Sequence, residues 1–415
     1  MLTINAERLL ARLQALAQIG RTQEGGVSRR AFSDADLEGR AWFQREVEEA
    51  GLLFRKDGAG NLSAILPAAD PQARTLLTGS HLDSVPNGGR YDGALGVLCA
   101  LEALQTIREK GIPMPYHLEA ISFTDEEGAC IGTFGSLAFS GALGEADLAR
   151  ARLDAAELSA ALQRLGLSRE SLFDARRDPA TLAGYVEVHI EQGSRLEEEQ
   201  VDIGVVTAIV GIRSYRVRFF GEAAHAGTKP MHKRRDALWG VVQFVARARE
   251  MVMQRFTPGV MNCGWVELAP GSFNIVPGRA TLALEFRHSS QSLLNEMQQA
   301  LLDLCAQAAE DNGLQWEAEP LAGTPPAAMH ADMMAAVEGA AERLGLSHMR
   351  LPSLAGHDAR SLSQITPTAM FFVPSVDGIS HNPREYTRDE DVINAGNVLL
   401  HTLLEVAQVP RVWWE

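Results

Sequence analysis

The feature that most constrains the fold is a set of short runs with apolar centres that alternate with helical segments. The strand-like run "ARTLLTGSH" is followed by a glycine-rich loop, the helix-like run "ALGVLCALEALQTI" and a second strand-like run, "YHLEAISF". Apolar strands that alternate with helices are typical of an α/β sheet covered on both faces. Residues 1–210 are therefore predicted to form an α/β domain.

The segment 211–325 has a different order of elements. A strand, "SYRVRFFGE", and a helix, "RRDALWGVVQFVARAREMVMQRF", precede two strands, "VMNCGWVELA" and "RATLALEFRHS", a second helix, "SLLNEMQQALLDLCAQAAEDNG", and a last strand, "QWEAEPLA". This βαββαβ order is that of a ferredoxin-like unit. After "GTPP" the first pattern resumes, and a length of 415 residues favours two domains. We predict a catalytic domain formed by 1–210 and 326–415 and an inserted domain formed by 211–325.

Composition and charge exclude several classes of protein. No apolar run reaches the ~18 residues of a membrane-spanning helix, and the N-terminus lacks the pattern of a signal peptide. Four cysteines lie scattered without metal-binding spacing, which predicts free thiols in the cytoplasm. A formal net charge of −15 argues against nucleic acid. A cytoplasmic protein without nucleic acid or membrane partners is expected.

Histidines and carboxylates follow the apolar runs in five places. The motifs "SHLD", "RYDG", "TDEEG", "VHIEQG" and "GISHNP" supply His81 and Asp83, Asp92, Asp125 to Glu127, His189 with Gln192, and His381. In open α/β sheets, ligands collect beyond the carboxyl ends of the strands. One such histidine usually caps a loop, and one acidic pair is usually a solvated turn. Five motifs in equivalent positions instead indicate a binding site.

These residue types point to metal-assisted hydrolysis. Imidazole and carboxylate groups are the ligands of zinc and similar divalent metals, which bind water, lower its pKa and polarise a carbonyl oxygen. The spacing of His81 and Asp83 allows the Asp83 carboxylate to accept the second ring N–H of His81 and to fix its tautomer. In the adjacent pair Glu126 and Glu127, one carboxylate can bind metal while the other stays free as a general base.

Together with "EAAHAGTKPMHKRRDA", "NIVPG" and "AGHDA", these motifs resemble the dinuclear-metal amidohydrolases of the aminoacylase and carboxypeptidase superfamily, in order along nearly the whole chain. More narrowly, they resemble its hydantoinase/carbamoylase branch, which contains N-carbamoyl-L-amino acid hydrolases, β-ureidopropionases and allantoate amidohydrolases. The resemblance implies a zinc-exopeptidase-like catalytic domain with a mixed central sheet. It also implies that the inserted domain is a dimerisation and lid domain. Histidine at position 189, where the peptidase branch tends to use aspartate, favours the carbamoylases.

The resemblance further implies two divalent metal ions per subunit, with zinc as the first candidate and manganese, cobalt or nickel as alternatives. The implied ligands are His81 and His189 for one ion, Glu127 and His381 for the other, and Asp92 as the bridge. Glu126 would be the general base for the attacking water. Asp83 would act in catalysis as the orienting partner of His81.

The resemblance also implies residues that contact the substrate. His225, Asn274 and Arg287 would reach the active site from the inserted domain of the opposite subunit. There His225 would help to stabilise the oxyanion, and Arg287 would hold the substrate carboxylate with both arms of its guanidinium group. The other implied substrate contacts are Gln192, Gly356 and His357. Alternatively, Arg287 is a surface residue at the end of a strand, and Asn274 only forms a turn. "LEFR" departs from the family pattern, because it has Glu285 where aspartate is usual.

The implied activity is that of a homodimer that hydrolyses the carbamoyl amide bond of an N-carbamoyl-L-amino acid to amino acid, CO2 and ammonia. Allantoate and N-carbamoyl-β-alanine, the substrate of β-ureidopropionase, are alternative small ureido acids. A metallo-aminoacylase or dipeptidase is a more distant alternative. A binding protein without activity would be expected to lack one of the five metal ligands, and all five are present.

Overall fold

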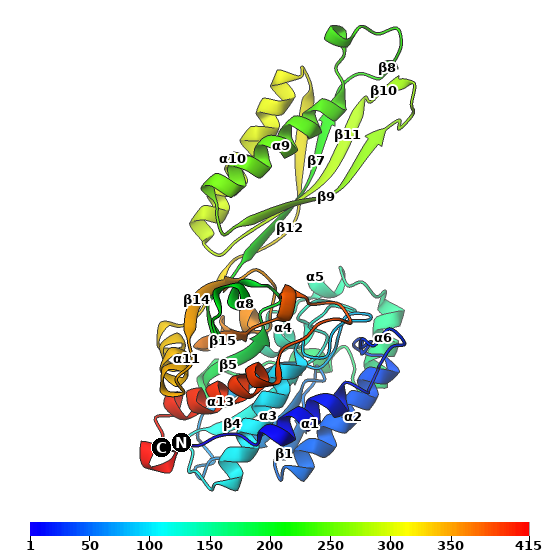
Figure 1. Cartoon of the computed structure of the whole chain (residues 1–415). Helices are drawn as coiled ribbons and strands as arrows, with labels where there is room; N and C mark the ends of the chain where they lie inside the picture. Colours follow the sequence, from blue (N-terminus) through cyan, green and yellow to red (C-terminus); the bar gives the residue numbers. More distant parts are fainter. Residues whose placement is uncertain (415) are drawn as a thin grey trace. The chain divides into compact units, whose positions relative to one another are not determined.

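The computed structural model of the protein describes residues 1–414, apart from the side chains of Ala322 and Trp413. Glu415, the last residue of the predicted catalytic domain, lies outside the described residues. The chain divides into two compact units (Figure 1). The first comprises 1–207, 329–351 and the chain from 355 onward, and the second comprises 208–328 and 352–354. The second unit thus spans nearly the same segment as the inserted domain expected at 211–325.

The first unit is built on a mixed β-sheet. Its strands are β1 (Leu53–Lys56), β2 (Leu62–Leu66), β3 (Thr75–His81), β4 (His117–Phe123), β5 (Leu182–Ile190), β6 (Ile203–Ile209), β14 (His348–Ser353) and β15 (Thr368–Val373). The order is β1-β2-β4-β3-β5-β15-β6, with β14 also paired to β6. Strands β4, β3, β5 and β15 are neighbours and run parallel, whereas β1, β2 and β6 pair antiparallel with their neighbours. The predicted mixed central sheet is confirmed.

Helices surround this sheet. They are α1 (Ala6–Leu16), α2 (Asp34–Glu49), α3 (Ala94–Glu109), α4 (Phe134–Ser140), α5 (Glu145–Leu148), α6 (Ala155–Arg164), α7 (Ser171–Asp174), α8 (Arg195–Glu199), α11 (Ala331–Arg343), α12 (Ala359–Leu362) and α13 (Asp389–Val406). Short 3-10 helices span Pro179–Thr181, Val376–Gly378 and Arg411–Trp413. Helices α1 and α13 contact α3, and α11 contacts α13, whereas α4 and α12 contact each other. The apolar helix α3 is buried from Ala94 to Ile107, as expected of a helix inside a core.

The approach of α3 to the sheet depends on a glycine. A Cβ atom on Gly96 would lie 2.3 Å from the carbonyl oxygen of Val188 in β5 and 2.9 Å from the Cβ of Ser80 in β3. Only a residue without a side chain lets the first turn of α3 lie directly against these two strands. Gly96 therefore fixes the distance between the sheet and the loop that precedes α3, which carries Asp92.

We expect Gly96→Ala to destabilise the protein by ~1–3 kcal/mol, the usual cost of overpacking, because the clash is with backbone and cannot be relieved by rotating a side chain. Gly339→Ala, within α11, is the matched control. A Cβ at Gly339 meets nothing within 4 Å, so this substitution should stabilise the helix by roughly 0.5–1 kcal/mol. Urea unfolding measures both changes. Equal stability of the two variants would contradict the close approach of α3.

The second unit is a four-stranded sheet with two helices. Strands β7 (Gly211–Phe220), β9 (Val260–Ala269), β11 (Arg279–His288) and β12 (Gln315–Thr324) pair antiparallel in the order β12-β7-β11-β9. Helices α9 (Ala237–Arg255) and α10 (Gln291–Asp311) lie side by side against the sheet (Figure 1). The short strands β8 (Ala224–His225) and β10 (Ile275–Val276) form a separate pair, β13 (Ala327–Ala328) pairs with the end of β6, and a 3-10 turn spans Met231–Lys233.

Two predictions about the type of protein can be compared with these elements. Within residues 1–414, none of the helices has the length and apolar character needed to cross a membrane. All four cysteines, Cys99, Cys130, Cys263 and Cys305, are free thiols. The free thiols agree with the sequence analysis.

Candidate metal centre

The predicted ligand motifs come together at one edge of the central sheet. The parallel strands β3 and β4 are in register at their carboxyl ends, where His81 pairs with Phe123, and β5 and β15 are in register where His189 pairs with Phe372. The turn with Glu126 and Glu127 follows β4, and the loop with His381 follows β15. Parallel neighbouring strands end at the same edge, so motifs far apart in the sequence meet there.

Asp92 lies in the middle of this cluster. Its Oδ1 atom is 3.1 Å from Nε2 of His189 and 3.7 Å from Nε2 of His81. Its Oδ2 atom is 3.2 Å from Nε2 of His381. Asp92 is only 6% exposed. One oxygen of this buried carboxylate therefore faces His81 and His189, and the other oxygen faces His381.

Two groups of possible metal ligands share Asp92. One consists of His81, Asp92 and His189, the other of Asp92, Glu127 and His381, and within each group the ligand atoms lie within 4.8 Å of one another. Oε2 of Glu127 is 3.6 Å from Nε2 of His381. Oε1 of Glu127 is buried and has no hydrogen-bond partner among the described residues. An unpartnered buried carboxylate oxygen within a set of imidazole and carboxylate donors fits a divalent metal ion.

Backbone carbonyls orient the two histidines of the first group. Nδ1 of His81 is 3.0 Å from the carbonyl oxygen of Asp83, and Nδ1 of His189 is 2.9 Å from that of Ile190. A carbonyl oxygen only accepts, so each Nδ1 carries the hydrogen and each Nε2 is the nitrogen that faces Asp92. This arrangement positions both Nε2 atoms for a metal ion beside Oδ1.

The sequence predicts that the Asp83 carboxylate accepts the ring N–H of His81, but the Asp83 carbonyl oxygen is the closer acceptor. Oδ1 of Asp83 is 3.7 Å from Nδ1 of His81, farther away than the Asp83 carbonyl oxygen. The carboxylate instead accepts the backbone N–H of Glu126 at Oδ1 and that of Glu127 at Oδ2, each at 3.2 Å. Asp83 thus orients His81 through its main chain and the glutamate pair through its side chain.

The two glutamates carry negative charge into a poorly solvated site. Burial, and secondly the charge of Asp358, raises the pKa of Glu126 well above its usual value. Burial, followed by the charge of Asp92, raises the pKa of Glu127 to about 7. Unneutralised carboxylates in such a site favour bound cations.

Within the chain, histidines balance the negative charge of Asp92. Burial alone would raise the pKa of Asp92, but hydrogen bonds with His189 and His381 hold it well below its usual value. Burial alone would lower the pKa of His189, but the hydrogen bond to Asp92 and the charges of Asp92 and Glu187 together raise it to about 9. A separate hydrogen bond to Asp92 is the main reason why the pKa of His381 also rises to about 9. Burial lowers the pKa of His81 to about 4, so its ring is neutral at pH 7. Metal ions would take over the role of these protons.

Three of the residues implied to contact substrate belong to the first unit. Nε2 of Gln192 donates to Oδ2 of Asp92 at 3.0 Å, and Gln192 has a left-handed backbone with φ of 58°. His357 is buried, and its ring centroid is 4.5 Å from that of His189. Gly356, the residue before His357, is exposed. The structure therefore brings Gln192 and His357 to the metal-ligand cluster.

Two of the others lie at the small strand pair of the second unit, His225 on β8 and Asn274 immediately before β10. His225 is exposed, pairs with Ile275, and accepts the backbone N–H of Gly227 at Nδ1 over 3.1 Å. The carbonyl oxygen of Asn274 accepts the N–H of Ala226 at 2.9 Å. His225 and Asn274 are thus neighbours at a two-stranded sheet, as two groups that act together would need to be.

Arg287 lies on β11 of the second unit and has partners within that unit. Its Nε and Nη2 atoms donate to Oε1 of Glu285 at 2.9 and 2.8 Å, and its Nη1 atom donates to the carbonyl oxygen of Leu354 at 2.8 Å. The side chain is 31% exposed. The guanidinium group is therefore held in one orientation by Glu285, the residue at which the chain departs from the family pattern.

Two further residues, which the sequence did not predict as site residues, contact the side chain or the backbone of Asp92. The carboxylate of Glu385 accepts the N–H of Asp92 at 3.1 Å, and the hydroxyl of Ser380 lies 3.1 Å from Oδ2 of Asp92. Both residues flank His381 in "ISHNPRE", and this proximity is the only signal that could have found them.

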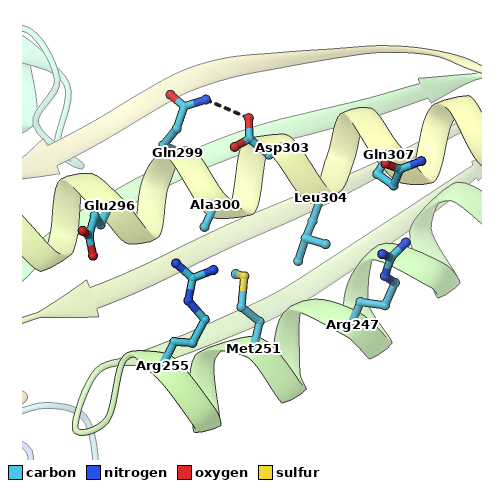
Figure 2. Close-up of a pocket in the computed structure, with 9 residues that line it drawn as sticks. All are labelled: Arg247, Met251, Arg255, Glu296, Gln299, Ala300, Asp303, Leu304 and Gln307. Carbon is cyan, nitrogen blue, oxygen red and sulfur yellow. Dashed lines mark hydrogen bonds between the residues drawn. The ribbon is translucent and has the colours of Figure 1, made fainter.

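A groove of about 450 Å³ in the second unit does not share this chemistry. It runs between α9 and α10 (Figure 2) and is lined by Arg247, Met251, Arg255, Glu296, Gln299, Ala300, Asp303, Leu304 and Gln307. The lining contains no histidine, and Figure 2 shows Gln299 hydrogen-bonded to Asp303 on the same helix. The groove is therefore a feature of the helical face and not a metal site.

Comparison with known proteins identifies the family. The model of Peptidase family M20/M25/M40 matches residues 77–405, which include every proposed metal ligand. The chain belongs to this family. An N-carbamoyl-L-amino acid amidohydrolase of Geobacillus stearothermophilus is 36% identical over 407 residues, covering 98% of this chain and 99% of that protein. The allantoate amidohydrolase of Escherichia coli is 32% identical over 413 residues, covering 98% and 99%.

Solved structures agree with this result. An amidase of the hydantoinase/carbamoylase family from Burkholderia multivorans is 37% identical, covers 98% of this chain and 99% of its own, and superposes with a TM-score of 0.90. The aminopeptidase PepT from Bacillus cereus, at 20% identity and a TM-score of 0.68, shares the fold. The resemblance to the hydantoinase/carbamoylase branch that the sequence indicated is thereby confirmed.

We expect Asp92→Ala to lose both metal ions and His381→Ala to retain one, because only Asp92 belongs to both ligand groups. Activity should fall in both variants by more than the ~10–100-fold typical of mutating a residue that only hydrogen-bonds to a metal ligand. Elemental analysis after dialysis against a metal buffer measures the number of metal ions bound per subunit. His330→Ala, an exposed histidine outside both groups, is the control. Equal metal content in Asp92→Ala and His381→Ala would show that Asp92 is not shared.

Proposed function

We propose that the protein is a dinuclear-metal amidohydrolase that hydrolyses the carbamoyl amide bond of N-carbamoyl-L-amino acids to amino acid, CO2 and ammonia. The observation that carries the proposal is the division of the Asp92 oxygens between two ligand groups, with Glu126 beside them but in neither. The relative named an N-carbamoyl-L-amino acid amidohydrolase, similar over 98% of this chain, supports the choice of substrate.

The residues of the two groups would hold two divalent metal ions, with zinc as the first candidate and manganese, cobalt or nickel as alternatives. His81, His189 and Asp92 would bind one ion, and Asp92, Glu127 and His381 the other. When bound, such ions activate water and polarise the carbonyl oxygen of the substrate. The neutral Nε2 of His81 and the unpartnered Oε1 of Glu127 supply donor atoms suited to this task.

Glu126 is proposed as the general base. Its Oε2 atom lies 3.6 Å from Nε2 of His81, next to the ligand cluster. It accepts a proton from the attacking water and later delivers that proton to the leaving nitrogen. Burial raises the pKa of Glu126, which makes its carboxylate a stronger proton acceptor than a solvated glutamate. The hydrogen bond from the Glu126 N–H to Asp83 keeps this part of the chain in place.

In the proposed homodimer, the second unit of each subunit recognises the two ends of the substrate bound at the metal centre of the opposite subunit. Arg287 would bind the carboxylate, which otherwise competes with the ureido group for the metal ions. His225 and Asn274 would donate to the oxygen that becomes negative in the transition state and to the substrate carboxylate. The pairing of Arg287 with Glu285 supports this role, because it fixes the orientation of the guanidinium group while Glu285 stays partly exposed.

We further propose that residues 211–325 form a ferredoxin-like domain that acts as a lid and joins two subunits into a homodimer. The βαββαβ element order and the antiparallel sheet support the fold. The edge strand β9 and the adjacent helix α9 expose large apolar side chains, which supports an interface there. These side chains are Trp239 and Val242 on α9 and Trp265 and Val266 on β9.

Allantoate hydrolysis is the second candidate. The allantoate amidohydrolases of Escherichia coli and Bacillus subtilis are 32% and 33% identical to this chain, close to the 31–36% of the N-carbamoyl-L-amino acid amidohydrolases. Allantoate is also a ureido acid, so the same centre could act on it.

A substrate panel tests the proposed function. Ammonia release would be measured with several N-carbamoyl-L-amino acids, N-carbamoyl-β-alanine, allantoate and an N-acetyl-L-amino acid, after loading with zinc, manganese, cobalt or nickel. The highest kcat/KM is expected with an N-carbamoyl-L-amino acid. For the acetyl compound, release of the free amino acid is measured instead, and preference for it would favour an aminoacylase. Preference for allantoate would select the second candidate.

Glu126→Gln should leave the metal content unchanged and reduce turnover by ~10²–10⁴-fold, the usual contribution of a general base. The reason is that Glu126 lies outside both ligand groups, whereas Glu127 belongs to one. Elemental analysis and single-turnover kinetics test the two parts. Glu127→Gln is the matched comparison and should lose metal. Loss of metal in Glu126→Gln, or nearly full turnover, would mean that the roles of the glutamates are different.

Arg287→Ala should lower kcat/KM for carboxylate-bearing substrates by at least about tenfold, because removing a charged hydrogen-bond partner costs ~1.5–3 kcal/mol. The same variant should lose much less activity on a substrate in which an amide replaces the carboxylate. Steady-state kinetics on both substrates gives the comparison. Equal losses on the two substrates would support the alternative that Arg287 is a structural surface residue.

A further inference from the structure

We propose that Glu385 is a positioning residue that holds Asp92 between the two ligand groups without binding metal itself. This inference rests on the proposed function only in taking Asp92 as the bridge. Glu385 belongs to neither ligand group, although it is 4% exposed and lies beside them. Its role is therefore to be found in the groups that its two oxygens contact.

One oxygen of Glu385 binds the main chain of the bridging residue. Oε1 accepts the N–H of Tyr91 at 2.9 Å and the N–H of Asp92 at 3.1 Å. Two consecutive backbone donors that meet at one carboxylate oxygen fix the orientation of the peptide plane between them. Because hydrogen bonds to a charged acceptor are stronger than those between neutral groups, this contact restrains the backbone at Asp92.

The other oxygen of Glu385 is linked to the Asp92 side chain. Oε2 is 3.0 Å from the hydroxyl of Ser380, and the same hydroxyl is 3.1 Å from Oδ2 of Asp92. Oδ2 is the oxygen that faces His381. The two carboxylates thus share the single hydrogen of the Ser380 hydroxyl, while the Glu385 carboxylate binds the main chain at Asp92 directly, although the two residues are 293 positions apart in the sequence.

The chain around Gly89 is shaped to admit the Glu385 carboxylate. A Cβ atom on Gly89 would lie 1.9 Å from Oε1 and 1.9 Å from Cδ of Glu385. Any other residue at position 89 would push the carboxylate away from the N–H groups of Tyr91 and Asp92. Gly89 therefore offers a second, independent way to break the same contact.

The function of this contact follows from its geometry. Both ligand groups need Asp92 in one place, since each uses a different oxygen of the same carboxylate. If the loop at Asp92 were free to move, each ion would lose the shared ligand for part of the time. Partners of metal ligands typically contribute 10–100-fold to metal affinity, and Glu385 should contribute an amount in this range.

The test compares metal affinities of the full-length protein, measured by competition with a chelator. Glu385→Ala and Gly89→Ala should each weaken zinc binding by ~10–100-fold, whereas Glu385→Gln keeps an oxygen acceptor for the two N–H groups and should lose less. Glu191→Ala is the matched control. Glu191 also accepts two backbone N–H groups, those of Arg195 and Leu196 at 2.9 and 2.8 Å, but it has no contact with Asp92 among the described residues.

The outcomes separate positioning from general stability. Weaker zinc binding in Glu385→Ala and Gly89→Ala, with recovery in Glu385→Gln and unchanged affinity in Glu191→Ala, would support the proposal. Wild-type affinity in Glu385→Ala, or an equal loss in Glu191→Ala, would overturn it. If Glu385→Ala does not fold, Glu385→Gln and Gly89→Ala decide between the same results. Zinc affinity needs no substrate, so failure of every ureido acid in the panel would leave this test intact.

Discussion

A single buried carboxylate determines how the candidate metal centre must be built. An unpaired carboxylate is costly to bury, and Asp92 is only 6% exposed. Three histidines surround it: Nε2 of His189 and Nε2 of His81 lie near Oδ1, and Nε2 of His381 lies near Oδ2. Because these histidines come from different strand ends, the position of Asp92 depends on the whole edge of the sheet.

The same dependence explains why hydrogen bonds to backbone N–H groups hold the loops at the metal centre in place. Asp83 holds the N–H groups of Glu126 and Glu127, and Glu385 holds those of Tyr91 and Asp92. In both places, a buried carboxylate that is not itself a proposed metal ligand fixes a segment that contains a proposed ligand. Negative charge thereby accumulates around the cluster, and each additional carboxylate raises the pKa of its neighbours. The arrangement that orients the ligands thus also makes the site favourable for cations.

Much of the centre could be predicted from the sequence, because parallel strands end at one edge. The apolar runs before His81, Asp125 and His189 were sufficient to place these motifs together. The role of Asp83 could not be predicted, since the choice between its carbonyl and its carboxylate depends on the turn geometry after β3. The pairing of Arg287 with Glu285 could have been foreseen, because residues i and i+2 of a strand share a face. Contacts such as that of Glu385, between loops far apart in the chain, carry no periodic signal.

The metal centre alone does not determine the substrate of an M20-family protein. The two ligand groups consist of histidines and carboxylates, which can bind metal ions for the hydrolysis of any amide. Neither group contains a lysine or arginine that could hold a substrate carboxylate away from the metal ions. Discrimination between a ureido acid and a peptide therefore has to come from residues outside the ligand set, and a shared fold does not supply it. In the proposed function this task belongs to Arg287, whose guanidinium group is held in one orientation by Glu285.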